Sequence, residues 1–157
     1  MKILMDADCL IKITKAGIKE KICRQFEVVI PLTIKEEVVD AGKAKNYPDA
    51  DLVEKNINAG LIVLESGKSS KRMKGDRALL EAFKISHYAA VATDDAKLTR
   101  LLRPSGISFI LPALLIFSVW KRGAIDQTTA LNWLEKLSAF ISEDEYSMVR
   151  LLLEEKK

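Results

Sequence analysis

Short apolar runs alternate with stretches of helical periodicity along the first two thirds of the chain. Runs of strand length lie at 2–5, 28–30, 61–64, 89–92 and 108–110. Apolar residues recur at helical spacing over 10–23, 34–41, 49–59, 77–85 and 96–102. Strands that alternate with helices are typical of βαβ units around a parallel sheet. We therefore predict an α/β fold with a mainly parallel sheet, and Gly17 predicts a break in the first helical stretch.

The pattern changes after Pro112, where three helices are predicted with no strand between them. They cover 113–121, about 127–140 and 144–155. The apolar stripes of the last two indicate packing onto the α/β core, with a dimer or partner surface as the alternative. The stripe residues are Leu131, Leu134, Leu137, Phe140, Ile141, Val149, Leu152 and Leu153. We accordingly predict a domain over 1–120 and a C-terminal helical extension over 121–157 packed on the same domain.

Composition places the chain among ordinary globular proteins. It has 157 residues, of which 48% are hydrophobic and 30% charged, and its net charge of +3 says little about partners. Cys9 and Cys23 have neither metal-ligand spacing nor a disulfide pattern, so we expect two buried thiols in a reducing compartment. The apolar run over 107–120 is interrupted by Pro112 and is too short to span a membrane. We expect a cytoplasmic protein that does not enter the membrane.

Carboxylates follow two of the predicted strands directly. Asp6 and Asp8 come after the first strand, and Asp94 and Asp95 come after the fourth. The carboxyl ends of neighbouring parallel strands form the crevice in which α/β proteins bind ligands. Carboxylates gathered there repel one another and resist burial unless a cation joins them. This pattern indicates a metal site.

Two further acidic positions stand at predicted helix starts. Glu36 and Glu37 open the helix after the second strand, and Asp76 precedes the helix over 77–85. Each acid taken alone also suits a helix cap or the helix dipole. Taken together, ligands that are all oxygen indicate a hard cation such as Mg²⁺ or Mn²⁺. The single histidine, His87, lies apart from these acids, which argues against a histidine triad or a zinc site.

A basic cluster precedes the helix over 77–85. It consists of Lys68, Lys71, Arg72, Lys74 and Arg77. Basic residues beside an acidic pocket suit a polyanionic substrate such as RNA, and a solvated loop is an equally good explanation. One or two Mg²⁺ ions held by carboxylates would activate water and neutralise the charge that develops on a phosphodiester. The residues therefore favour nucleic-acid cleavage as a hypothesis.

Four segments, in this order and at these intervals, resemble the PIN-domain ribonucleases, most closely the VapC-like toxins and their relatives. The segments are 3–10, 29–39, 75–83 and 92–98. The resemblance covers roughly residues 1–120. It implies an α/β/α sandwich with a parallel sheet and a metal-dependent endoribonuclease.

The resemblance also implies roles for individual residues. Residues in the metal-binding and catalytic positions are Asp6, Glu36, Asp76 and Asp95. Thr93 and Asp8 take supporting positions, in which they would orient a carboxylate or a water molecule. Two choices stay open. Adjacent helical side chains point about 100° apart, so one of Glu36 and Glu37 faces the site, and we favour Glu36. Asp94 is an alternative to Asp95, or a second ligand beside it.

If the chain is a toxin, we expect a small antitoxin that inserts a C-terminal segment with an Arg or Lys across the acidic groove, because the clustered carboxylates favour a cation. We also expect a homodimer. The helices after residue 120 exceed a minimal toxin of this type, so the toxin role is a separate question from the nuclease fold.

Two rival functions are compatible with the sequence. In a haloacid-dehalogenase-like phosphatase, Asp6 would be the nucleophile and Asp8 the general acid, but Glu36 and Asp76 would have no role. In a non-catalytic PIN-like module, the carboxylates would hold a structural metal and the protein would only bind RNA or a partner.

Overall fold

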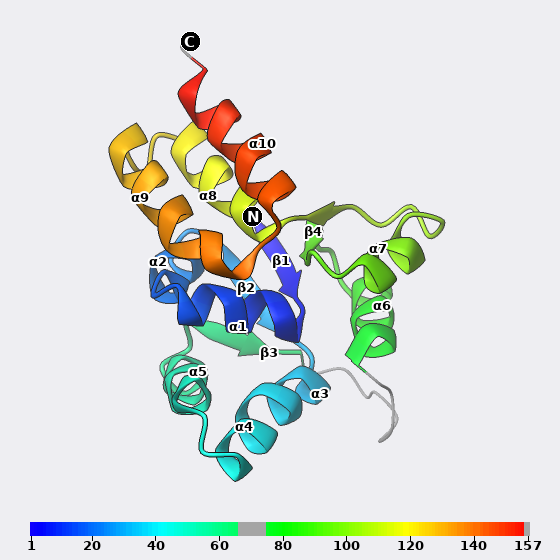
Figure 1. Ribbon diagram of the computed structural model, residues 1–157. Coiled ribbons are helices and arrows are strands. Elements are labelled where there is room, and N and C mark those ends of the chain that lie inside the picture. The colour runs from blue at the N-terminus through cyan, green and yellow to red at the C-terminus, as the bar shows by residue number, and fades with distance from the viewer. Residues whose placement is uncertain (66–74, 156–157) are drawn as a thin grey trace.

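The computed structural model describes residues 1–65 and 75–155, which form one parallel sheet covered by helices (Figure 1). The strands are β1 (Lys2–Met5), β2 (Glu27–Ile30), β3 (Ile62–Leu64), β4 (Ala90–Ala92) and β5 (Phe109–Ile110). Their order across the sheet is β3-β2-β1-β4-β5, and every pairing is parallel. The prediction of an α/β fold with a mainly parallel sheet is confirmed.

The crossovers place helices on both faces of the sheet. The chain runs from β1 to β2 through α1 (Ala7–Lys15) and α2 (Lys19–Cys23), and Gly17, at φ 70°, makes the predicted break. From β2 to β3 it forms α3 (Leu32–Lys35), the π-helical turn η1 (Glu36–Asp40), α4 (Ala41–Ala44) and α5 (Pro48–Asn58). The chain then crosses back to β4 and β5 through α6 (Gly75–Ile85) and α7 (Ala96–Leu102). Parallel crossovers are right-handed as a rule, so the reversed direction of these connections is expected to put α6 and α7 on the opposite face, as in an α/β/α sandwich.

The central strand explains why the first apolar run is continuous. β1 pairs with β2 on one side and β4 on the other, and its Ile3, Leu4 and Met5 are fully buried. A strand that is covered on both faces needs apolar side chains on both, so apolar and polar residues do not alternate along it. Cys9 and Cys23 are free thiols inside the same core, as predicted.

Three helices follow β5 and pack together: α8 (Pro112–Lys121), α9 (Gln127–Leu137) and, after the 3₁₀ turn η2 (Ser138–Phe140), α10 (Glu143–Glu154). Leu134, Leu137, Val149 and Leu153 belong to the main hydrophobic core. The apolar stripes of α9 and α10 therefore face the core of the domain. Within the described part of the chain, no helix is long and apolar enough to cross a membrane.

Candidate metal centre

Asp6 lies at the carboxyl end of β1. The connection after β1 runs toward β2 and the connection after β4 runs toward β5, in opposite directions across the sheet. Asp6 is only 5% exposed and caps the start of α1, because its Oδ1 accepts a hydrogen bond from the Cys9 N–H at 2.7 Å. Its Oδ2 accepts a hydrogen bond from the Thr93 hydroxyl. The Asp6 N–H donates to the Ala92 carbonyl at 3.2 Å. The carboxylate is thus held between β1 and β4, at the switch point where α/β proteins bind ligands.

The position is unfavourable for a lone negative charge. Burial raises the pKa of Asp6 to about 7, although the hydrogen bonds from Thr93 and Cys9 act in the opposite direction. The nearby carboxylates of Asp8 and Asp94 raise it further. A cation beside Asp6 would remove this penalty.

Thr93 connects Asp6 to the acid after β4. It is fully buried, and its Oγ1 accepts a hydrogen bond from the Asp95 N–H at 3.1 Å while its hydroxyl donates to Asp6. Asp95 caps α7 by accepting from the Leu98 N–H at 2.7 Å. One hydroxyl therefore sets the separation of two aspartates that are far apart in sequence, which is the placement expected of a supporting residue.

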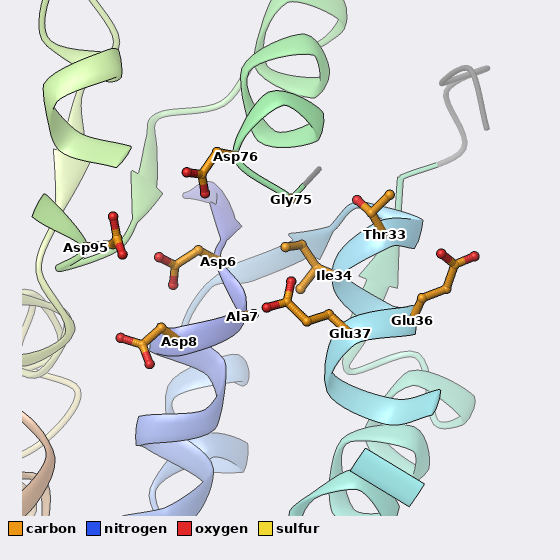
Figure 2. Close-up of a pocket in the computed structure, with 10 residues that line it drawn as sticks. All are labelled: Asp6, Ala7, Asp8, Thr33, Ile34, Glu36, Glu37, Gly75, Asp76 and Asp95. Atoms are coloured by element: carbon orange, nitrogen blue, oxygen red, sulfur yellow. The ribbon is translucent and has the colours of Figure 1, made fainter. Parts of the chain in front are cut away.

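An open pocket of about 510 Å³ lies at this edge of the sheet (Figure 2). It is lined by Asp6, Ala7, Asp8, Thr33, Ile34, Glu36, Glu37, Gly75, Asp76 and Asp95. Figure 2 shows the carboxylates of Asp6, Glu37, Asp76 and Asp95 around a common space, with Asp8 at its rim and its carboxylate turned outward. The acids predicted from four separate segments of the sequence thus meet in one pocket.

The two adjacent glutamates point in different directions. The sequence favours Glu36 as the inward-facing residue. In the structure the Glu37 carboxylate turns toward the other carboxylates, whereas Glu36, which also lines the pocket, points away from them (Figure 2). Burial raises the pKa of Glu37, and Asp76 and Asp8 raise it further. Spacing along the helix does not distinguish the two glutamates, because Thr33 and Ile34 both line the pocket and lie three positions before Glu36 and Glu37. No local signal in the sequence therefore separates the two glutamates, and only the packing of the helix in the structure does.

Asp94 and Asp95 also differ in what their side chains contact. Asp95 lines the pocket, whereas the Asp94 Oδ2 lies 2.6 Å from the Lys12 Nζ and Asp94 is not among the lining residues. Asp8 does both: it lines the pocket, and its Oδ2 lies 2.9 Å from the same ammonium. The sequence gives no sign that Lys12 would contact these acids, since nothing in the local pattern of α1 distinguishes it from a surface lysine.

The pocket suits a hard divalent cation by the chemistry of its donors. Within residues 1–65 and 75–155, no three acidic, histidine or cysteine side chains converge on a single point as a finished metal site. The four inward-facing donors are nevertheless all carboxylates, and the described residues that line the pocket include no lysine or arginine. Such a set of oxygens matches the preference of Mg²⁺ or Mn²⁺.

The predicted basic cluster is described only in part. Lys68, Lys71, Arg72 and Lys74 lie outside the described residues. Arg77 is exposed in the first turn of α6, directly after Asp76.

Gly75 brings α6 close to Glu37, so Gly75→Ala should disturb the pocket. A Cβ at this position would lie 3.3 Å from Glu37 Oε2 and 3.1 Å from Ile34 Cδ1. We expect the Glu37 carboxylate to be displaced and the Kd for Mn²⁺ to rise about tenfold, measured by calorimetry. The control is Gly75→Ala in a Glu37→Gln background, where the added methyl should have little further effect. An equal loss in both backgrounds would show that Glu37 is not the residue affected.

Comparison with known proteins connects this geometry to a family. A family model described as a PIN domain matches residues 2–155, nearly the whole chain. A search of curated proteins found no match.

Proposed function

The chain belongs to the PIN-domain family, and from this premise we propose that it is a divalent-metal-dependent endoribonuclease. PIN domains are generally nucleases. The observation that carries the proposal is the set of carboxylates of Asp6, Glu37, Asp76 and Asp95, which face one open pocket at the carboxyl edge of the sheet.

These four carboxylates are the proposed ligands of Mg²⁺ or Mn²⁺. When bound, the ion supplies a Lewis acid that lowers the pKa of water and neutralises charge on a phosphodiester. Thr93 holds Asp6 and the backbone of Asp95 in position through its hydroxyl. Asp8 lies at the rim of the pocket, where we expect it to orient a water molecule. Preorganised carboxylates of this kind reduce the rearrangement needed when metal and substrate bind.

Basic residues at the start of α6 and before it in the sequence would hold the RNA backbone. Arg77 is exposed next to Asp76, and Lys71, Arg72 and Lys74 precede it in sequence. Arginine and lysine contacts to phosphate supply affinity that falls as salt is added. We assign these residues to backbone binding, which leaves sequence preference to other contacts.

A toxin role is the narrower form of the proposal. The supporting observation is the carboxylate-rich pocket, whose charges would be neutralised by an Arg or Lys from a small antitoxin. Copurification of the chain with the product of a neighbouring short reading frame would support this role, and isolation of a homodimer alone would count against it.

The direct test is incubation of the purified protein with a panel of structured and single-stranded RNAs, with Mn²⁺, Mg²⁺ or EDTA. We expect internal cleavage with either metal and none with EDTA. Glycerol phosphate is the control substrate, because its hydrolysis in place of RNA would favour the phosphatase alternative. RNA binding without cleavage across the whole panel would favour the non-catalytic module.

The two glutamates supply a matched pair of variants. Glu37→Gln should reduce Mn²⁺-dependent cleavage about a hundredfold or more, because it removes an inward-facing carboxylate next to Asp76. Glu36→Gln should leave the rate within about twofold, since its side chain points away. Cleavage rates at saturating Mn²⁺ and at limiting Mn²⁺ check this. The opposite ranking would restore Glu36 as the ligand.

A further inference from the structure

Lys12 brings a fixed positive charge into the acidic edge of the sheet. From α1, its Nζ reaches Asp8 Oδ2 at 2.9 Å and Asp94 Oδ2 at 2.6 Å. The Lys12 side chain is only 19% exposed. Burial works against its charge, but the carboxylates of Asp94 and Asp8 outweigh that effect and raise the pKa of Lys12. The ammonium therefore joins two of the acids that sequence analysis placed around the site.

Asp94 depends on this ammonium for its charge balance. Its Oδ1 is buried and has no hydrogen-bond partner among the described residues. The neighbouring carboxylate, Glu145, is itself buried and accepts from the Ala113 N–H at 2.8 Å. Within the described part of the chain, Lys12 is the one cation in ion-pair distance of Asp94 or Asp8. Removal of its charge would leave Asp8, Asp94 and Glu145 without a counter-ion.

The position of the ammonium is also one that suits a divalent cation. Carboxylate oxygens from two different segments, α1 and the loop after β4, converge on it. In two-metal sites the ions stand about 3.5–4 Å apart and share carboxylates between them. Asp8 is such a shared group, because it lines the metal pocket and also contacts Lys12.

We infer that Lys12 is a positioning residue that stands in the place of a second cation. Its ammonium occupies the position between Asp8 and Asp94, and this leaves Asp6, Glu37, Asp76 and Asp95 to hold a single divalent ion. The inference rests on the proposed metal site and deepens it, because it states how many ions the site takes and why Asp94 is not a ligand.

Counting bound Mn²⁺ tests the inference without reference to activity. Metal-free wild type, Lys12→Met and Lys12→Arg are titrated with Mn²⁺, with heat and the electron paramagnetic signal of free Mn²⁺ as readouts. We expect one equivalent in wild type and in Lys12→Arg, which keeps the charge, and two in Lys12→Met. Two equivalents in wild type, or one in Lys12→Met, would overturn the inference. No binding by wild type would instead refute the proposed metal site.

A second pair of variants covers the case in which Lys12→Met does not fold, judged by thermal unfolding. Asp94→Asn should bind the same number of Mn²⁺ ions as wild type, with a Kd within about twofold, because Asp94 pairs with Lys12 and is not a metal ligand. Asp95→Asn should raise the Kd at least about tenfold, since Asp95 lines the metal pocket. If both substitutions weaken Mn²⁺ binding equally, Asp94 is a metal ligand and the assignment of Lys12 fails.

Discussion

Asp6→Asn should reduce metal-dependent RNA cleavage about a thousandfold or more while the protein remains folded. Asp6 is the most deeply buried of the pocket carboxylates and is held by both the Cys9 N–H and the Thr93 hydroxyl. A metal ion contributes several kcal/mol to the stabilisation of charge in such a reaction, and each 1.36 kcal/mol is worth about tenfold in rate. Asparagine keeps the oxygen that caps α1 but removes the charge that holds the ion.

The measurement is the initial rate of cleavage over a series of Mn²⁺ concentrations, with circular dichroism to verify the fold. Asp51→Asn is the matched control, because that side chain is 77% exposed and lies on α5, outside the pocket. We expect the control to cleave at the wild-type rate. Substantial activity in folded Asp6→Asn would exclude Asp6 as a required ligand and weaken the nuclease proposal as a whole.

The stability of the metal-free protein should fall as pH rises from about 4 to about 7. The pKa of Asp6 is raised from 3.8 to about 7 in the folded state by burial. In this interval the folded chain holds a proton that the unfolded chain has released, so the free energy of unfolding decreases with pH. A shift of about 3 pH units corresponds to at most about 4 kcal/mol. Above pH 7 the contribution is constant, and Mn²⁺ should restore stability there because it takes the place of the proton.

Urea unfolding at pH 5 and pH 8 in EDTA measures this effect. Wild type should lose more stability than Asp6→Asn between the two pH values, since the variant has no carboxyl to titrate at this position. The raised pKa values of Glu37 and Glu145 act in the same direction and will leave a smaller slope in the variant. Identical slopes in the two proteins would show that the Asp6 carboxyl does not carry this pH dependence.

The sequence was sufficient for the fold because the fold depends on local periodicity. A buried parallel strand shows as a continuous apolar run, as in 2–5, and an amphipathic helix shows as helical spacing. Strand ends were predicted to within one residue at β1 and β4. The same logic located the acids, since residues that follow parallel strands gather at one edge of the sheet.

Local periodicity did not determine the direction of individual side chains within that edge. Glu36 and Glu37 are the same residue type in the same helical turn. Only the packing of α3 and η1 turns Glu37 toward Asp76. Asp94 and Asp95 are likewise interchangeable in the sequence. Their contacts differ in the structure. Asp94 forms an ion pair with Lys12 of α1, whereas Asp95 is held by the Thr93 hydroxyl and by the start of α7.

The sequence by itself thus determined the type of fold, the strands that carry the acids and an oxygen-only donor set. The tertiary structure decided which carboxylate of each adjacent pair faces the pocket, which one is buried enough to have a raised pKa, and that a lysine lies among them. The reason is that orientation, burial and charge pairing depend on contacts between residues far apart in the chain, such as Lys12 with Asp94 and Thr93 with Asp6. The periodicity of residues within a single segment does not predict those contacts.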